Sequence, residues 1–112
     1  MKMINAIIRP EKADALWQAL HTLGVRGMTV TESKGYGLGL SEQQRYRTVK
    51  CRTDFLSELK IEIAIVDEML ESVIATIKEV CATGEVGDGK IFVMNLEQVI
   101  RIRTGEKNAE AL

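Results

Sequence analysis

Residues 84–90, GEVGDGK, carry the clearest chemical signal in the chain. Their spacing fits the G-x-x-x-x-G-K pattern of a phosphate-binding loop. Two features depart from that pattern: Ile91 stands where the Mg²⁺-binding Ser or Thr belongs, and a strand-like segment follows where a helix should begin. We therefore predict a glycine-rich turn whose backbone N–H groups bind an anion beside Lys90. The alternative is a helix C-terminus followed by a plain tight turn, with Lys90 in solvent.

Arg101 and Arg103 form the second candidate site. The alternation in VIRIR, residues 99–103, predicts a strand, and the i, i+2 spacing would place both guanidinium groups on one sheet face. Paired arginines suit bidentate binding of phosphate or carboxylate. A solvated edge strand, or an ion pair with Glu62, would explain the same pattern. If Lys90 converges with both arginines, the cations would repel one another until a polyphosphate bound.

The remaining reactive side chains give weaker signals. His21 lies off the apolar stripe of its predicted helix, so we assign it no metal. Cys51 is close to two cationic residues that would lower the pKa of its thiol, which leaves open a redox role or an ordinary loop thiol. Cys81 falls on an apolar helix stripe and is predicted to be in the core. Glu62 could act as a general base, but no nucleophile is paired with it, and we predict no enzyme.

Strands and helices that alternate along the chain must position these groups. Pro10 suits a helix start and Gly24 a helix end, and Asp67 is the expected N-cap of a second helix. The order is β-α-β, a long polar segment, and β-α-β. It predicts one α+β domain over residues 1–112, a ferredoxin-like split βαβ fold (βαββαβ) whose antiparallel sheet has both helices on one face, with a mobile tail at 104–112. The predicted strands are residues 2–9, 28–34, 59–66, 91–94 and 99–103, and the helices run from about 11 to 23 and from 67 to 81.

Composition limits the classes of function. The chain has 112 residues, is 46% hydrophobic and 28% charged, and so should form a globular core. A domain of this size buries a limited share of its surface, which favours self-association. A net charge of −1 and 4% aromatic residues argue against nucleic-acid binding. No apolar run is long enough to cross a bilayer, and no direct membrane insertion is expected. Two cysteines make no disulfide framework, so we expect a reduced, cytoplasmic protein.

Several segments resemble the PII nitrogen-regulatory proteins, in order and from end to end. The most specific are TGEVGDGKIFV and VIRIRTGE; MKMINAIIRPEK, GMTVTE, KGYG, TDFL and KIEI also match. The resemblance implies a ferredoxin-like subunit of a cytoplasmic homotrimer that binds ATP or ADP between subunits, with Mg²⁺ possible alongside ATP. It also implies a regulatory protein, which controls nitrogen metabolism or a transporter through contact with a target protein.

The same resemblance implies the roles of individual residues. Thr29 and Ala64 would contact the adenine, residues 35–38 would lie near the nucleotide, and residues 87–90 would hold the phosphates. Arg101 and Arg103 would reach the phosphates from the adjoining subunit. The full expected nucleotide-binding set is Ile7, Gly27, Thr29, Gly35, Tyr36, Gly37, Leu38, Glu62, Ala64, Gly87, Asp88, Gly89, Lys90, Arg101 and Arg103.

Residues 38–55 correspond to the flexible effector loop of the family, which docks on targets such as ammonium transporters and nitrogen-metabolism enzymes. Tyr46 and Arg47 match a loop tip that some members insert into a transporter pore. Cys51 stands where many members carry a uridylylated tyrosine, so that modification is excluded. We expect these three residues to contact the partner protein.

Two further departures concern 2-oxoglutarate. Gly39 replaces a glutamine that coordinates Mg²⁺ and helps to hold this ligand, and Glu58 replaces a lysine that pairs with its carboxylate. An anion in place of a cation should repel a dicarboxylate, so we expect a weakened 2-oxoglutarate response. One alternative is a sensor of bicarbonate, another anion or redox state that regulates carbon metabolism or transport. An ATP-hydrolysing enzyme is the alternative from another class.

Overall fold

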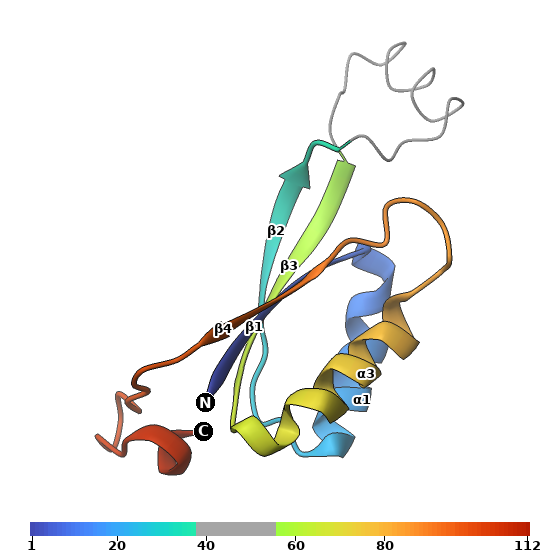
Figure 1. Ribbon diagram of the computed structural model, residues 1–112. Helices are drawn as coiled ribbons and strands as arrows, with labels where there is room; N and C mark the ends of the chain where they lie inside the picture. Colours follow the sequence, from blue (N-terminus) through green and yellow to red (C-terminus); the bar gives the residue numbers. More distant parts are fainter. Residues whose placement is uncertain (38–55) are drawn as a thin grey trace.

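The computed structural model describes residues 1–37 and 56–112. Over these residues the strands form one antiparallel sheet in the order β2-β3-β1-β4, and α1 and α3 lie side by side across one face of it (Figure 1). This arrangement confirms the predicted α+β, ferredoxin-like fold. Its elements are β1 (Lys2–Ile8), α1 (Ala13–Leu23), β2 (Thr29–Gly35), β3 (Leu56–Ile65), α3 (Leu70–Cys81) and β4 (Ile91–Asn95), with short 3-10 helices η1 (Pro10–Lys12), η2 (Asp67–Met69) and η3 (Asn108–Ala111).

The core lies between the sheet and the helices, where strand alternation and helix periodicity meet. Every second residue of β1 and β3 faces α1 and α3, because side chains alternate across a strand. The apolar stripe of each helix covers these residues. The buried side chains are Ile4, Ala6, Ile8, Leu16, Leu20, Val25, Ile61, Ile63, Ile65, Val73, Ile77 and Cys81.

The helix ends follow local chemistry with one correction. Pro10 begins η1, which leads into α1, and Gly24 ends α1 in the left-handed conformation with φ of 110°. Asp67 is not the N-cap of the second helix: Val66 holds the extended N-cap conformation, and Asp67 is already in the first turn. Its carboxylate instead forms an ion pair with the Met1 amine, with 2.7 Å between the amine nitrogen and Oδ1. An acidic residue in the first turn also interacts favourably with the helix dipole.

The sheet face without helices is mixed in character. Asn5 lies on β1 between Glu62 of β3 and Phe92 of β4, and its buried Oδ1 has no hydrogen-bond partner in residues 1–37 and 56–112. Phe92 and Met94 alternate on this face and are 48% and 44% exposed. The face therefore presents apolar side chains and, among the described residues, a buried amide oxygen without a hydrogen-bond partner.

The predicted strand at 99–103 is wrong. Ile100 forms only an isolated bridge with Lys107, and the intervening residues make a tight loop closed by the hydrogen bond from Gly105 N–H to the Arg101 carbonyl at 2.8 Å. Alternation shows which residues share a side, but a strand also needs a neighbour with which to pair, and none of the described strands runs beside this segment. Arg101 and Arg103 therefore share no sheet face. The tail at 104–112 carries η3 and provides Lys107 to the bridge with Ile100, and its mobility stays a prediction.

Candidate functional site

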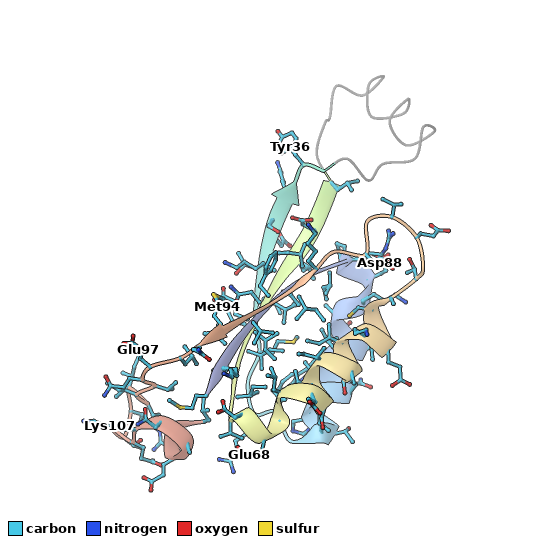
Figure 2. The ribbon with its side chains drawn as sticks, viewed as in Figure 1. Tyr36, Glu68, Asp88, Met94, Glu97 and Lys107 are labelled. Carbon is cyan, nitrogen blue, oxygen red and sulfur yellow. The ribbon has the colours of Figure 1, made fainter. Side chains whose placement is uncertain are left out.

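Most of the expected nucleotide-binding residues line two separate grooves. The first, which we call the turn groove, has a volume of about 460 Å³ and lies between the end of β2 and the turn that precedes β4. In Figure 2, Tyr36 and Asp88 mark this end of the molecule, and Lys107 lies at the opposite end. The turn groove is lined by Ile7, Gly35, Tyr36, Gly37, Leu56, Glu58, Gly87, Gly89, Lys90 and Phe92.

The glycine turn packs directly against the end of β1. The Ile7 N–H donates to the Lys90 carbonyl at 2.9 Å, and Gly89 has φ of 87°. A Cβ at Gly89 would collide with the Ile7 carbonyl oxygen, so this position requires glycine. Within the described residues the N–H groups of Gly87, Gly89 and Lys90 meet no acceptor. These groups and the Lys90 ammonium are donors of the kind that bind anions, so anion binding at this turn stays a prediction.

The Asp88 side chain links the two ends of the turn through hydrogen bonds. Its carboxylate accepts hydrogen bonds from the Thr83 hydroxyl at 2.6 Å, the Thr83 N–H at 2.8 Å, the Gly84 N–H at 3.0 Å and Arg9 Nε at 3.0 Å. These donors, the Thr83 hydroxyl first, hold the pKa of the Asp88 carboxyl far below its usual value. The side chain is thus committed to the turn, and only the backbone of Asp88 is placed to contact a phosphate.

Glu58 brings a negative charge to the turn groove. It lies on β3, opposite Ser33 of β2, and its carboxylate covers Gly35: a Cβ at Gly35 would lie 2.5 Å from Glu58 Oε1. The same groove contains Lys90. Anionic ligands here would meet the glycine turn and Lys90 on one side and a carboxylate on the other.

The second groove, which we call the C-terminal groove, has a volume of about 450 Å³ and collects most of the other expected residues. Thr29 begins β2 and Gly35 ends it, so the two grooves lie about 20 Å apart along this strand, at roughly 3.3 Å per residue. The C-terminal groove is lined by Met3, Arg26, Gly27, Met28, Thr29, Glu62, Ala64, Arg101, Ala111 and Leu112.

The predicted cations do not converge within one chain. Arg101 lines the C-terminal groove, and its guanidinium pairs with the Glu106 carboxylate at 3.1 Å. It also donates to the carbonyls of Glu110 at 3.3 Å and Ala111 at 3.4 Å. Arg103 is exposed and has no ion-pair partner among the described residues. Lys90, in the turn groove, is therefore separated from Arg101 in the single chain.

Sequence reasoning missed Arg9 and Thr83, which hold Asp88 in place. An acidic residue inside an anion-binding turn was the available signal, because a carboxylate there needs donors of its own. Thr83 lies within the same segment, but Arg9 is 79 residues away from Asp88. Periodicity could not have paired those two residues.

Some expected features fall elsewhere. Leu38, Tyr46, Arg47 and Cys51 lie outside the described residues. In residues 1–37 and 56–112, no group of three or more His, Cys, Asp and Glu side chains could hold a metal ion. No helix in the same ranges is long and apolar enough to cross a membrane.

Comparison with known proteins gives the family. The model of the nitrogen regulatory protein P-II family matches residues 1–106. The nitrogen regulatory protein P-II of Azospirillum brasilense is 46% identical over 112 residues, which cover 100% of both chains. Those of Rhizobium meliloti (strain 1021) and Nostoc punctiforme (strain ATCC 29133 / PCC 73102) are 47% and 48% identical over the same full length. The chain belongs to the P-II family of nitrogen regulatory proteins.

Membership confirms the resemblance and the regulatory class that it implied. The chain is a nitrogen regulatory signalling protein and not an enzyme. The P-II match ends at residue 106, and so covers the glycine turn and both arginines.

Proposed function

We propose that this chain is a cytoplasmic, homotrimeric sensor of ATP or ADP, which regulates nitrogen metabolism or a transporter through contact between residues 38–55 and a target protein. The observation that carries the proposal is the division of the expected site between two grooves about 20 Å apart along β2. In this proposal each groove supplies part of the groups that bind an adenine nucleotide.

The two half-sites are complementary in chemistry. The turn groove offers backbone N–H groups and Lys90 to phosphates. The C-terminal groove offers Ala64 and Thr29 to a base and has Arg101 at its edge. If the turn groove of one copy faces the C-terminal groove of the next, Arg101 and Arg103 come to the phosphates from the neighbouring subunit. A head-to-tail contact of this kind closes into a ring when the rotation allows it.

Exposed apolar side chains support self-association. Phe92 and Met94 are about half exposed on the open sheet face, and Ile102, beside Arg101 and Arg103, is 99% exposed. Apolar surface of this kind marks interaction sites in soluble proteins. Asn5, with its unsatisfied Oδ1, lies in the same sheet face and would gain a partner or an ordered water in an interface.

Mixed trimers test the proposal. We expect Lys90→Met and Arg103→Met each to lower ATP and ADP affinity by roughly tenfold or more, because each loses a charge-assisted hydrogen bond. When the two variants are unfolded together and reassembled, every mixed trimer should contain one intact site, formed by Lys90 of one variant and Arg103 of the other. Calorimetry should therefore show tight binding at one site in each mixed trimer. Lys107→Met serves as the charge-matched control near Arg103.

The proposal fails if the protein is monomeric by sedimentation, or if neither ATP nor ADP binds with or without Mg²⁺. It also fails if mixing the variants restores no tight sites, since Lys90 and Arg103 of the same chain would then bind the same nucleotide.

Glu58 favours a second candidate that shares this fold. Its carboxylate in the turn groove disfavours a dicarboxylate, so we propose that the 2-oxoglutarate response is weakened. The groove would then serve another small molecule, such as bicarbonate. Thermal melts of the Mg-ATP complex with 2-oxoglutarate and with bicarbonate distinguish the two, because a ligand that binds the folded protein raises its melting temperature.

A further inference from the structure

We propose that Arg9 is a positioning residue for the phosphate-binding turn, residues 83–90. It holds the Asp88 carboxylate and the Val86 carbonyl so that the free N–H groups of the turn face the ligand. The inference rests on the proposed function, because it takes this turn as the element that binds phosphate.

The geometry of Arg9 suits this role. It follows β1 directly, in an extended conformation with φ of −67° and ψ of 137°, and its side chain is only 23% exposed. Nε donates to Asp88 Oδ1 and Nη2 donates to the Val86 carbonyl, both at 3.0 Å. One rigid, planar guanidinium thus holds two points on either side of Gly87. A lysine could not reproduce both contacts, since its charge is a single point.

The ion pair between Arg9 and Asp88 also offsets the negative charge that Asp88 brings to the turn. A carboxylate beside a phosphate site would repel the ligand, yet Asp88 is needed to accept hydrogen bonds from Thr83 and Gly84. The Arg9 cation offsets that negative charge at close range. The ligand then meets a turn whose internal carboxylate is neutralised, with Lys90 as the additional cation.

Arg9 ties the turn to β1, and the neighbouring backbone reinforces the tie. Two residues before Arg9, the Ile7 N–H binds the Lys90 carbonyl, and the Ile7 carbonyl lies against Gly89. Contacts at Val86, Asp88 and Lys90 thus alternate with Gly87 and Gly89, whose N–H groups have no acceptor within the described residues. Loss of Arg9 would release the first half of the turn and leave the second half attached.

Calorimetry on the full-length protein tests this role with ATP, ADP and adenosine. In Arg9→Met we expect ATP and ADP affinity to fall by roughly tenfold to a hundredfold, because two hydrogen bonds from a charged donor are lost. Adenosine, which has no phosphate, should bind as it does to the unchanged protein. Arg9→Lys should recover part of the loss. The control is Lys12→Met, which removes a nearby ammonium group that makes no hydrogen bond or ion pair within the described residues, while the backbone hydrogen bond from the residue 12 N–H to the Arg9 carbonyl is kept; it should leave all three affinities unchanged.

Equal losses for ATP and adenosine, or full recovery in Arg9→Lys, would overturn the positioning role. A second readout keeps the test valid if the unchanged protein binds no nucleotide and the proposed function itself is wrong. Backbone ¹⁵N relaxation of residues 84–90 should show a turn that is rigid in the unchanged protein and more mobile in Arg9→Met. An equally rigid turn in both proteins would refute the inference on its own.

Discussion

Replacing Gly89 by alanine tests how closely the glycine turn must lie against β1. An alanine at φ of 87° costs about 1–2 kcal/mol, because its Cβ approaches the following carbonyl. The same Cβ would collide with the Ile7 carbonyl, and moving away would break the hydrogen bond from Ile7 N–H to the Lys90 carbonyl, worth about 1 kcal/mol. We expect Gly89→Ala to lower the free energy of unfolding by about 2–3 kcal/mol, a large share of the ~5–15 kcal/mol of a typical domain.

Gly84→Ala is the matched control. Gly84 has nearly the same φ, 82°, but among the described residues no atom beyond its own chain neighbours lies within 4 Å of the place where its Cβ would be. Gly84→Ala should therefore lower the free energy of unfolding only by the cost of placing alanine at a positive φ, about 1–2 kcal/mol. Urea unfolding of both variants at one protein concentration measures the difference, since the stability of an oligomer depends on concentration. Equal losses in the two variants would refute the argument that the close approach to Ile7 is what requires glycine at position 89.

Three further predictions concern the groove, the turn and the interface. Glu58→Lys should raise 2-oxoglutarate affinity in the presence of Mg-ATP, because it replaces the carboxylate of the turn groove with a cation; calorimetry that shows no gain would contradict the proposed effect of Glu58. Asp88→Asn should lower stability at pH 7. Because the pKa of the Asp88 carboxyl is lowered in the fold, its contribution is complete above its usual value of 3.8 and is lost as the pH falls below that. Urea unfolding should show the gap in stability between Asp88→Asn and the unchanged protein narrowing steadily as the pH falls below the usual pKa of 3.8. A gap that widens on acidification would contradict this reasoning. Ile102→Asp should shift the protein toward smaller species in sedimentation, since this 99% exposed side chain belongs to the proposed interface; an unchanged trimer would place Ile102 outside it.

Local pattern was enough to predict most of the fold. Alternation in the sequence accounts for the burial of Ile4, Ile61 and their neighbours, and the four-residue spacing of Leu16 and Leu20 accounts for the side of α1 that packs on the sheet. Gly24 predicted the end of α1 because few other residues adopt its left-handed conformation at low cost. The run of glycines before Lys90 predicted a turn open to an anion for the same local reason.

Only the tertiary structure decided which distant groups meet. Arg9 reaches Asp88 across 79 residues, and a guanidinium on one segment contains no signal of the carboxylate that it will bind. The alternation at 99–103 was real, but Ile102 is exposed because no described strand pairs with that segment. Periodicity specifies the direction in which a side chain points. The partner that it meets depends on how the chain closes long loops and packs its layers, and those contacts exist only in the folded molecule.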